Sequence, residues 1–168
     1  MMIGDGNMFK LSNIEKMTRE ERYKLMINFV TSQMSSENDI LANLSNISAI
    51  IYVMLDDINW SGFYLKRGDE LVLGPFQGKP ACNRIKIGHG VCGTAAKLRK
   101  IQRVENVEEF PGHIACDCES KSEIVIPIIK NDELYGVLDI DSPFLKRFSD
   151  LEEKYLVKLV DKLVEYMK

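Results

Sequence analysis

The sequence predicts an α+β domain in which helices at both ends of the chain pack on a mostly antiparallel sheet. Apolar residues recur at helical spacing near both ends, and the middle of the chain alternates apolar and polar residues between short turn signals. We expect one domain, 1–168, because a chain of this length buries roughly 70% of its unfolded surface. Residues 1–17 are expected to be an irregular N-terminal segment.

Two helices are expected at the N-terminal end and one at the C-terminal end. Thr18 with Glu21, and Ser149 with Glu152, fit the capping box that marks a helix start. The apolar positions of the first two helices are Tyr23, Met26, Ile27, Val30, Met34, Ile40, Leu41, Leu44, Ile47, Ile51 and Met54. The last helix carries Leu151, Tyr155, Leu156, Leu159, Val160, Leu163, Val164 and Met167.

The middle of the chain is expected to form the sheet. The elements, in order, are strands at 59–66, 70–76 and 83–88, a short helix at 90–98, a short strand at 101–104, a loop at 105–121, and hairpin strands at 122–130 and 133–142. The hairpin turns around Asn131-Asp132, which are residues typical of tight turns.

This hairpin predicts where three carboxylates lie. A three-residue loop at 131–133 would place Glu123 opposite Asp141, and Asp139 opposite Val125. Like charges opposite each other destabilise a sheet. The patch is therefore either a solvated outer face or a pocket for a cation or a protonated carboxyl group. The other face, expected to contact the terminal helices, carries Ile124, Ile126, Ile128, Leu134, Leu138 and Ile140.

The composition argues against two classes of partner. With 22 Lys and Arg against 25 Asp and Glu, we expect no binding to nucleic acid or to a membrane surface. No apolar run approaches the roughly 20 residues of a membrane helix, and the N-terminus lacks a signal-peptide run. A cytoplasmic location is expected, where cysteines are more often free, metal-bound or redox-active than in stable disulfides.

The four cysteines are Cys82, Cys92, Cys116 and Cys118. Their spacing does not fit structural zinc ligands, so no metal is expected. A Cys–His–Asp triad can be drawn with His113 as base, although a nearby histidine is more often a hydrogen-bonded loop residue. Dithiol redox chemistry needs an exposed thiolate, a role that suits Cys116, and a second thiol, for which Cys82 or Cys92 is suitable. The remaining alternative is free thiols without a role.

The segment GHGVCG (88–93) matches the G-x-G-x-x-G pattern of dinucleotide-binding proteins. The preceding strand alternates polar and apolar residues, whereas parallel Rossmann strands are continuously apolar, which argues against that function. Such a turn can also provide helix N–H groups to an anion. The same helix start is expected to lower the pKa of Cys92.

Six motifs point to one family. They are ACNRIKIGHGVCGTAA (81–96), GHIACD (112–117), Ser122-Glu123, GVLDIDS (136–142), NWSGFYL (59–65) and LGPFQGKPAC (73–82). Together, over about residues 18–165, they resemble the free methionine-(R)-sulfoxide reductases, which are single GAF domains. The resemblance implies a GAF-like fold with the terminal helices on one face of the sheet and the substrate pocket on the other.

Carried over by position, the resemblance implies that Cys116 is the catalytic cysteine and Cys82 its resolving partner. Cys92 corresponds to a third family cysteine, able to take part in disulfide exchange, while Cys118 falls where no family cysteine is expected. The implied substrate-site residues are the acids Glu123, Asp139 and Asp141 and the aromatic residues Trp60 and Tyr64.

The chemistry implied by this family begins when Cys116 attacks the sulfur of free methionine (R)-sulfoxide. A carboxyl group kept neutral by its neighbours protonates the oxygen, and Cys116 is left as a sulfenic acid. Cys82 condenses with it to a disulfide, which a thioredoxin then reduces. No cofactor is expected, and a homodimer is compatible with the family. The alternative is a non-catalytic GAF module that senses a small ligand, which has no need of these cysteines together.

Overall fold

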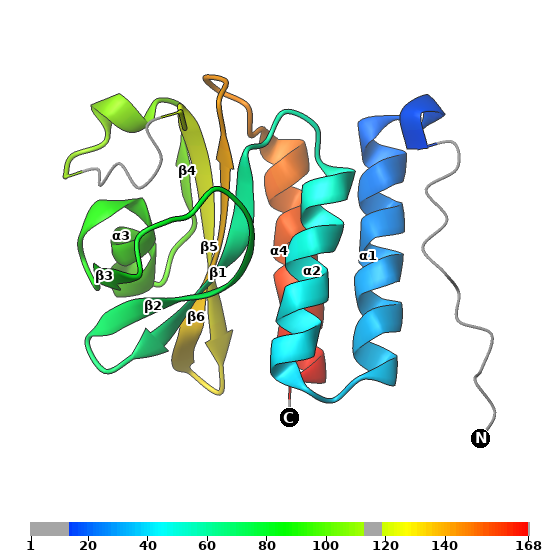
Figure 1. The fold of residues 1–168 in the computed structure, drawn as a ribbon, viewed down its shortest axis with the longest axis horizontal. Coiled ribbons are helices and arrows are strands. Elements are labelled where there is room, and N and C mark those ends of the chain that lie inside the picture. The colour runs from blue at the N-terminus through cyan, green and yellow to red at the C-terminus, as the bar shows by residue number, and fades with distance from the viewer. Residues whose placement is uncertain (1–13, 113–118, 168) are drawn as a thin grey trace.

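The computed structural model describes residues 14–112 and 119–167, and these form a layered α+β domain. Within them, an antiparallel six-stranded sheet has the strand order β3-β2-β1-β6-β5-β4. Helices α2 and α4 pack on one face of the sheet with α1 outside them, and α3 lies on the other face (Figure 1). The expected fold class is confirmed.

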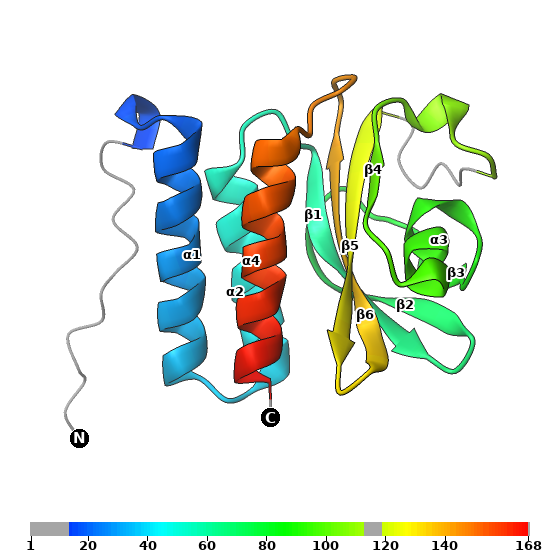
Figure 2. The ribbon, with the colours of Figure 1, turned by 180° about the vertical axis from the view of Figure 1, so that it is seen from behind.

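The elements follow the expected order. The helices are α1 (Arg19–Ser36), α2 (Ile40–Met54), α3 (Gly90–Leu98) and α4 (Asp150–Tyr166), with short 3-10 turns η1 (Ile14–Lys16) and η2 (Val107–Glu109). The strands are β1 (Trp60–Arg67), β2 (Glu70–Gly78), β3 (Arg84–Lys86), β4 (Gln102–Val104), β5 (Ser122–Lys130) and β6 (Glu133–Ser142). Seen from behind, α4 lies between α1 and the sheet, while β2 and β3 curl away toward α3 (Figure 2).

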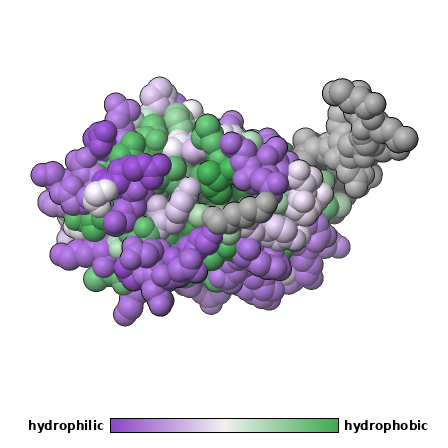
Figure 3. Space-filling model, turned by 90° about the horizontal axis from the view of Figure 1, so that it is seen from below, coloured by the Kyte–Doolittle hydropathy of each residue, from purple (hydrophilic) through white to green (hydrophobic). Residues whose placement is uncertain are grey.

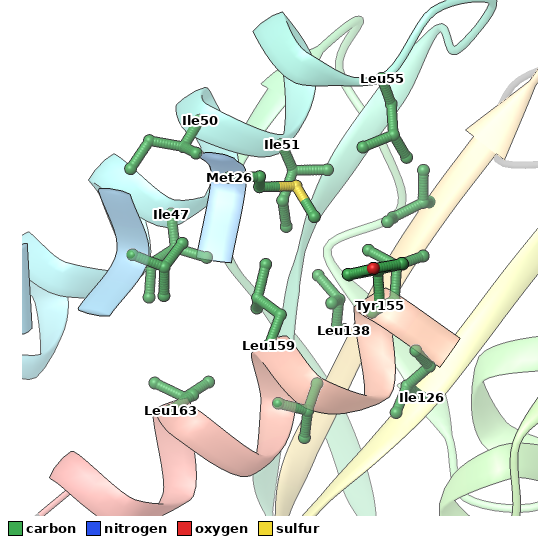
Figure 4. Packing of buried hydrophobic residues seen from close by; sticks show 14 of the residues in the cluster. Met26, Ile47, Ile50, Ile51, Leu55, Ile126, Leu138, Tyr155, Leu159 and Leu163 are labelled. Atoms are coloured by element: carbon green, nitrogen blue, oxygen red, sulfur yellow. The ribbon is translucent and has the colours of Figure 1, made fainter. Parts of the chain in front are cut away.

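Both expected capping boxes are present. Thr18 begins α1 and Ser149 begins α4, each with a glutamate three residues later that accepts a hydrogen bond from the cap backbone N–H. The apolar stripes behind these caps meet the inner face of the sheet in the main core (Figure 4). The residues labelled there are Met26, Ile47, Ile50, Ile51, Leu55, Ile126, Leu138, Tyr155, Leu159 and Leu163.

The hairpin turn differs from the expected three-residue loop. The turn has two residues, Asn131 and Asp132, because Lys130 pairs with Glu133, and both turn residues have positive φ. A register shift between Ile128 and Ile129 then adds one residue to β6, which restores the expected register further along the hairpin.

This shift corrects one core assignment. Leu134 packs with the cluster on the α3 side of the sheet, whereas it was expected to face the terminal helices. The reason is that Leu134 precedes the extra residue of β6, so its side chain lies on the opposite face from Leu138 and Ile140, which pack with the helices as expected.

No helix in the described residues is long and apolar enough to cross a membrane. The face that carries the lower ends of the helices is largely hydrophilic, with hydrophobic residues visible between the polar ones (Figure 3).

Candidate active site

The expected carboxylates meet on the α3 face of the sheet. Glu123 on β5 pairs directly with Asp141 on β6, and Val125 pairs with Asp139, as the sequence predicts. On the other side of β6, Trp60 of β1 pairs with Asp141. Because side chains alternate along each strand, these acids and Trp60 share one face.

Helix α3 covers the acids and brings a thiol against them. The Sγ of Cys92 lies 3.8 Å from Oε1 of Glu123. The side chains of Cys92, Glu123 and Asp139 are 4%, 7% and 6% exposed, so the cluster is excluded from solvent. Asp141, at the end of the same face, is partly exposed. The patch is therefore a buried acidic cluster beneath α3 and not a solvated outer face.

This burial determines the protonation of the acids. Loss of solvation, followed by the charges of Asp139 and Asp141, raises the pKa of Glu123 well above its usual value. Loss of solvation also raises the pKa of Asp139 to about 6, although hydrogen bonds with Cys92 and Glu123 oppose the rise. Glu123 is therefore the carboxyl group held neutral, and it can donate a proton.

The expectation that the helix start lowers the pKa of Cys92 is wrong. Burial, followed by the charges of Asp139 and Glu123, raises the pKa of this thiol well above its usual value. The position near the N-terminus of α3 does not outweigh the loss of water and the adjacent carboxylates. Cys92 is a free, buried thiol that these surroundings keep protonated.

Aromatic side chains form the wall beside the acids. Trp60 stacks on Tyr64 with ring centroids 5.9 Å apart, and on Phe76 at 5.3 Å. The indole N–H of Trp60 donates to the carbonyl of Lys79, at 3.1 Å, so the ring is held at its polar end as well. The sequence pointed to Trp60 and Tyr64 but missed Phe76, whose place depends on the pairing of β2 with β1.

Gly62 is a second residue that sequence reasoning missed. It pairs with Asp139 on one side and with Phe76 on the other. A Cβ atom at this position would lie 2.4 Å from Cβ of Phe76 and 2.7 Å from the Trp60 ring. The glycine therefore allows the aromatic wall to approach the acids, and its only sequence signal was a glycine inside an expected strand.

Cys82 lies at the edge of this pocket. The hydroxyl of Tyr64 donates to its carbonyl oxygen at 2.9 Å, and Cys82 is disulfide-bonded. Cys116, Cys118 and His113 fall in residues 113–118, outside the described residues, so the expected roles of Cys116 and Cys118 stay predictions.

Residues 119–120, which directly follow that segment, lie next to the loop that contains Cys82. Lys79 Nζ lies 2.5 Å from Oε2 of Glu119, and Nδ2 of Asn59 donates to Oγ of Ser120 at 3.2 Å. Glu119 follows Cys116 by three residues, and Lys79 precedes Cys82 by three. The chain thus reaches the aromatic wall immediately after the segment that contains Cys116.

The chain is similar to proteins of one family. The GAF domain model matches residues 39–164. The free methionine-R-sulfoxide reductase of Escherichia coli (strain K12) is 50% identical over 147 residues, which cover 88% of this chain and 89% of that protein.

Two solved structures are similar over almost the same length. The reduced form of fRMsr of Staphylococcus aureus has a TM-score of 0.84 and 49% identity, covering 87% of this chain and 95% of that one. The free methionine-R-sulfoxide reductase of Neisseria meningitidis in complex with its substrate has a TM-score of 0.86 and 38% identity. The match covers 89% of this chain and 90% of that one. The chain therefore belongs to the GAF domain family, and within it to the free methionine-R-sulfoxide reductases.

Proposed function

We propose that this protein reduces free L-methionine (R)-S-oxide to methionine on the α3 face of the sheet. The observation that carries the proposal is the buried pairing of Glu123 with Asp141, beside Asp139. Reduction of a sulfoxide needs a proton for the departing oxygen, and a carboxyl group kept neutral by burial and like charges is a suitable donor. The relatives named for this activity support the same conclusion.

Three parts of the substrate have matching groups near the acids. The substrate ammonium is held by Asp141 and Asp139, whose negative charge favours a cation. The S-methyl group packs on Trp60, since a buried indole ring offers a large apolar surface. Glu123 donates the proton to the sulfoxide oxygen.

In the first step the Cys116 thiolate attacks the sulfoxide sulfur while Glu123 protonates the oxygen. The hydroxyl group then moves from the substrate sulfur to the Cys116 sulfur as the bond between the two sulfurs breaks, so methionine leaves and Cys116 becomes a sulfenic acid. The Cys82 thiol then displaces this oxygen as water and forms a Cys82–Cys116 disulfide. A thioredoxin dithiol reduces the disulfide, so two electrons and two protons are consumed for each methionine formed.

One contact supports this assignment of cysteines. The Lys79–Glu119 ion pair brings together the segments that lead to Cys82 and Cys116. Exchange through Cys92 stays a prediction, and its raised pKa makes it a slower nucleophile at neutral pH. Dependence on thioredoxin fits the expected cytoplasmic location. Assembly as a homodimer also stays a prediction.

The test is a coupled assay with each free methionine sulfoxide epimer, thioredoxin, thioredoxin reductase and NADPH. We expect NADPH loss with the R epimer only, and its abolition in Cys116→Ser. Turnover of the S epimer alone, or full activity in Cys116→Ser, would contradict the proposal. Tight binding of the R epimer without turnover would instead indicate a non-catalytic GAF sensor.

A further inference from the structure

Three donor groups of different elements converge in the pocket wall. The Cys92 sulfur of α3, a Glu123 oxygen of β5 and an Asp139 oxygen of β6 all lie within 4.8 Å of one another. Each side chain is more than nine-tenths buried. In the part of the chain that the structure describes, this is the one group of histidine, cysteine and acidic side chains close enough to share a metal ion.

A second observation is a buried polar atom in the cluster that has no partner among the described residues. The Oδ1 atom of Asp139 is buried and has no hydrogen-bond partner among the described residues. A buried carboxylate oxygen without a partner costs folding free energy, so native proteins usually provide a donor or a cation. Asp139 lies on the same face as Glu123 and beneath α3, so a cation in the cluster would satisfy it.

We propose that Cys92, Glu123 and Asp139 form a regulatory binding site for Zn²⁺ that inhibits the reductase. One thiolate and two carboxylates are ligands that Zn²⁺ accepts, and three protein ligands leave a fourth position for water. Tetrahedral Zn²⁺ with ordinary bond lengths separates a sulfur and an oxygen ligand by about 3.6 Å. The observed separation of Cys92 Sγ and Glu123 Oε1 is 3.8 Å, so little rearrangement is required.

Binding is an exchange of protons for a metal ion. The Cys92 thiol and the Glu123 carboxyl group release their protons to solvent as the ion binds, and no electron is transferred. The positive charge of Zn²⁺ offsets the negative charges that are otherwise unfavourable in a buried cluster. Affinity should therefore increase with pH, because fewer protons compete for the ligands at high pH.

The inhibitory consequence rests on the proposed function, whereas metal binding does not. With Zn²⁺ in place, Glu123 has no proton to donate and Asp139 no longer attracts the substrate ammonium. Zn²⁺ and the substrate should therefore exclude each other. Inhibition should be reversed by a chelator or by a high concentration of substrate.

The binding test uses the reduced, chelator-treated full-length protein. Zn²⁺ affinity is measured against a chromophoric chelator, and Cd²⁺ is added separately to detect thiolate-to-metal charge-transfer absorption. We expect one ion per chain with a cysteine charge-transfer band. Cys92→Ser should remove the band and weaken Zn²⁺ binding by at least about 10- to 100-fold, because mutation of a residue that only orients a metal ligand already has an effect of that size.

Matched variants identify the site. Cys82→Ser removes a different pocket cysteine and should keep the band and the affinity. If Cys92→Ser does not fold by circular dichroism, Glu123→Gln and Asp139→Asn test the same site through its oxygen ligands. The proposal would be overturned if Zn²⁺ binding persists without Cys92, or without both oxygen ligands, and is instead lost in Cys82→Ser or Cys116→Ser.

The inhibition test measures methionine release from the reduced enzyme in a single turnover, which avoids the metal-binding thiols of thioredoxin. Zn²⁺ should raise the substrate concentration needed for half-maximal release without lowering the maximum. Zn²⁺ bound through Cys92 without any effect on release would overturn the inhibitory role. A protein that binds Zn²⁺ but releases no methionine under any condition would contradict the reductase function while leaving the metal site supported.

Discussion

At the scale of single residues, burial determines which side chains of the site hold a proton. Glu123 and Asp139 lie in the same pocket wall, and both have raised pKa values because solvent is excluded. The sequence predicted their proximity from strand alternation alone. It could not predict the protonation of Cys92, because burial and the neighbouring acids outweigh the effect of a helix start, and both depend on how α3 packs on the sheet.

Glu123→Gln should lower kcat/KM for free methionine (R)-sulfoxide by about 100-fold or more, because the amide cannot donate a proton as an acid. In the wild type, kcat/KM should fall on the alkaline side as Glu123 loses its proton. This alkaline fall should be absent in the variant. The measurement is a pH profile of both proteins, and an unchanged alkaline limb in Glu123→Gln would assign the proton to another group.

Asp139→Asn should make the folded protein more stable at pH 8. The pKa of Asp139 rises from 3.8 in the unfolded chain to about 6 in the fold, so its charge costs stability as the pH increases through this interval. A shift of about two units corresponds to about 3 kcal/mol at most, and the difference should vanish below pH about 4.

Urea unfolding at several pH values measures this effect, with the exposed Glu133→Gln at the other end of β6 as control. We expect the control to change stability by less than about 0.5 kcal/mol at every pH. Lower stability of Asp139→Asn throughout the range would show that the carboxylate is stabilising in the fold.

At the scale of elements, the hairpin of β5 and β6 shows how far sequence patterns reach. Alternation correctly placed Glu123 opposite Asp141, although the assumed three-residue loop was wrong. A two-residue turn and one extra residue in β6 have the same net effect on register as the longer loop. The face of the sheet on which Leu134 packs could not be predicted, because it depends on where along β6 the extra residue lies.

The pairing of β1 with β2 brings Phe76 and Trp60 close to Gly62, and Gly62→Ala should disturb this approach. The added methyl group would meet Phe76 and the Trp60 ring inside van der Waals distance. We expect a loss of about 1–3 kcal/mol in unfolding free energy and a higher KM for the substrate.

Gly68→Asn is a suitable control for this substitution. Gly68 lies at a turn with positive φ, nothing is within 4 Å of its Cβ position, and asparagine tolerates this backbone conformation. We expect near-wild-type stability and KM. If Gly62→Ala behaved like this control, close approach of the aromatic wall would not determine substrate binding.

At the scale of the whole molecule, the two faces of the sheet have separate roles. The helix side supplies the main core, while the α3 side holds buried charge. A polar network closes the helix side, where Glu152 accepts hydrogen bonds from Tyr23 at 2.7 Å and from Arg147 at 3.0 Å. The capping box pattern predicted the contact of Ser149 with Glu152. The contacts of Glu152 with Tyr23 of α1 and with Arg147 of the loop before α4 could not be predicted, because they depend on the tertiary structure.

Glu152→Gln should destabilise the fold by about 3–5 kcal/mol at pH 7, because it leaves the buried Arg147 charge without its partner. Burial alone would raise the pKa of Glu152, but hydrogen bonds from Ser149, Tyr23 and Arg147 outweigh it and lower the pKa to about 2. The stabilisation is therefore complete above pH about 4.5 and is lost as the pH falls toward 2.

Denaturant unfolding against pH tests this prediction, with the partly exposed neighbour Glu153→Gln as control. The control pairs with Arg103 at the surface and should cost less than about 1 kcal/mol. A pH-independent loss in Glu152→Gln would mean that packing, not charge, is responsible.

In the proposed reaction, the protein reduces the free sulfoxide to methionine and oxidises two of its own thiols. The most direct measurement is a single turnover with reduced protein, free methionine (R)-sulfoxide and no other reductant, with methionine and remaining thiols counted together. We expect about one methionine per chain, the loss of two thiols, and a Cys82–Cys116 disulfide detected by mass spectrometry. No methionine, or methionine without loss of thiols, would contradict it.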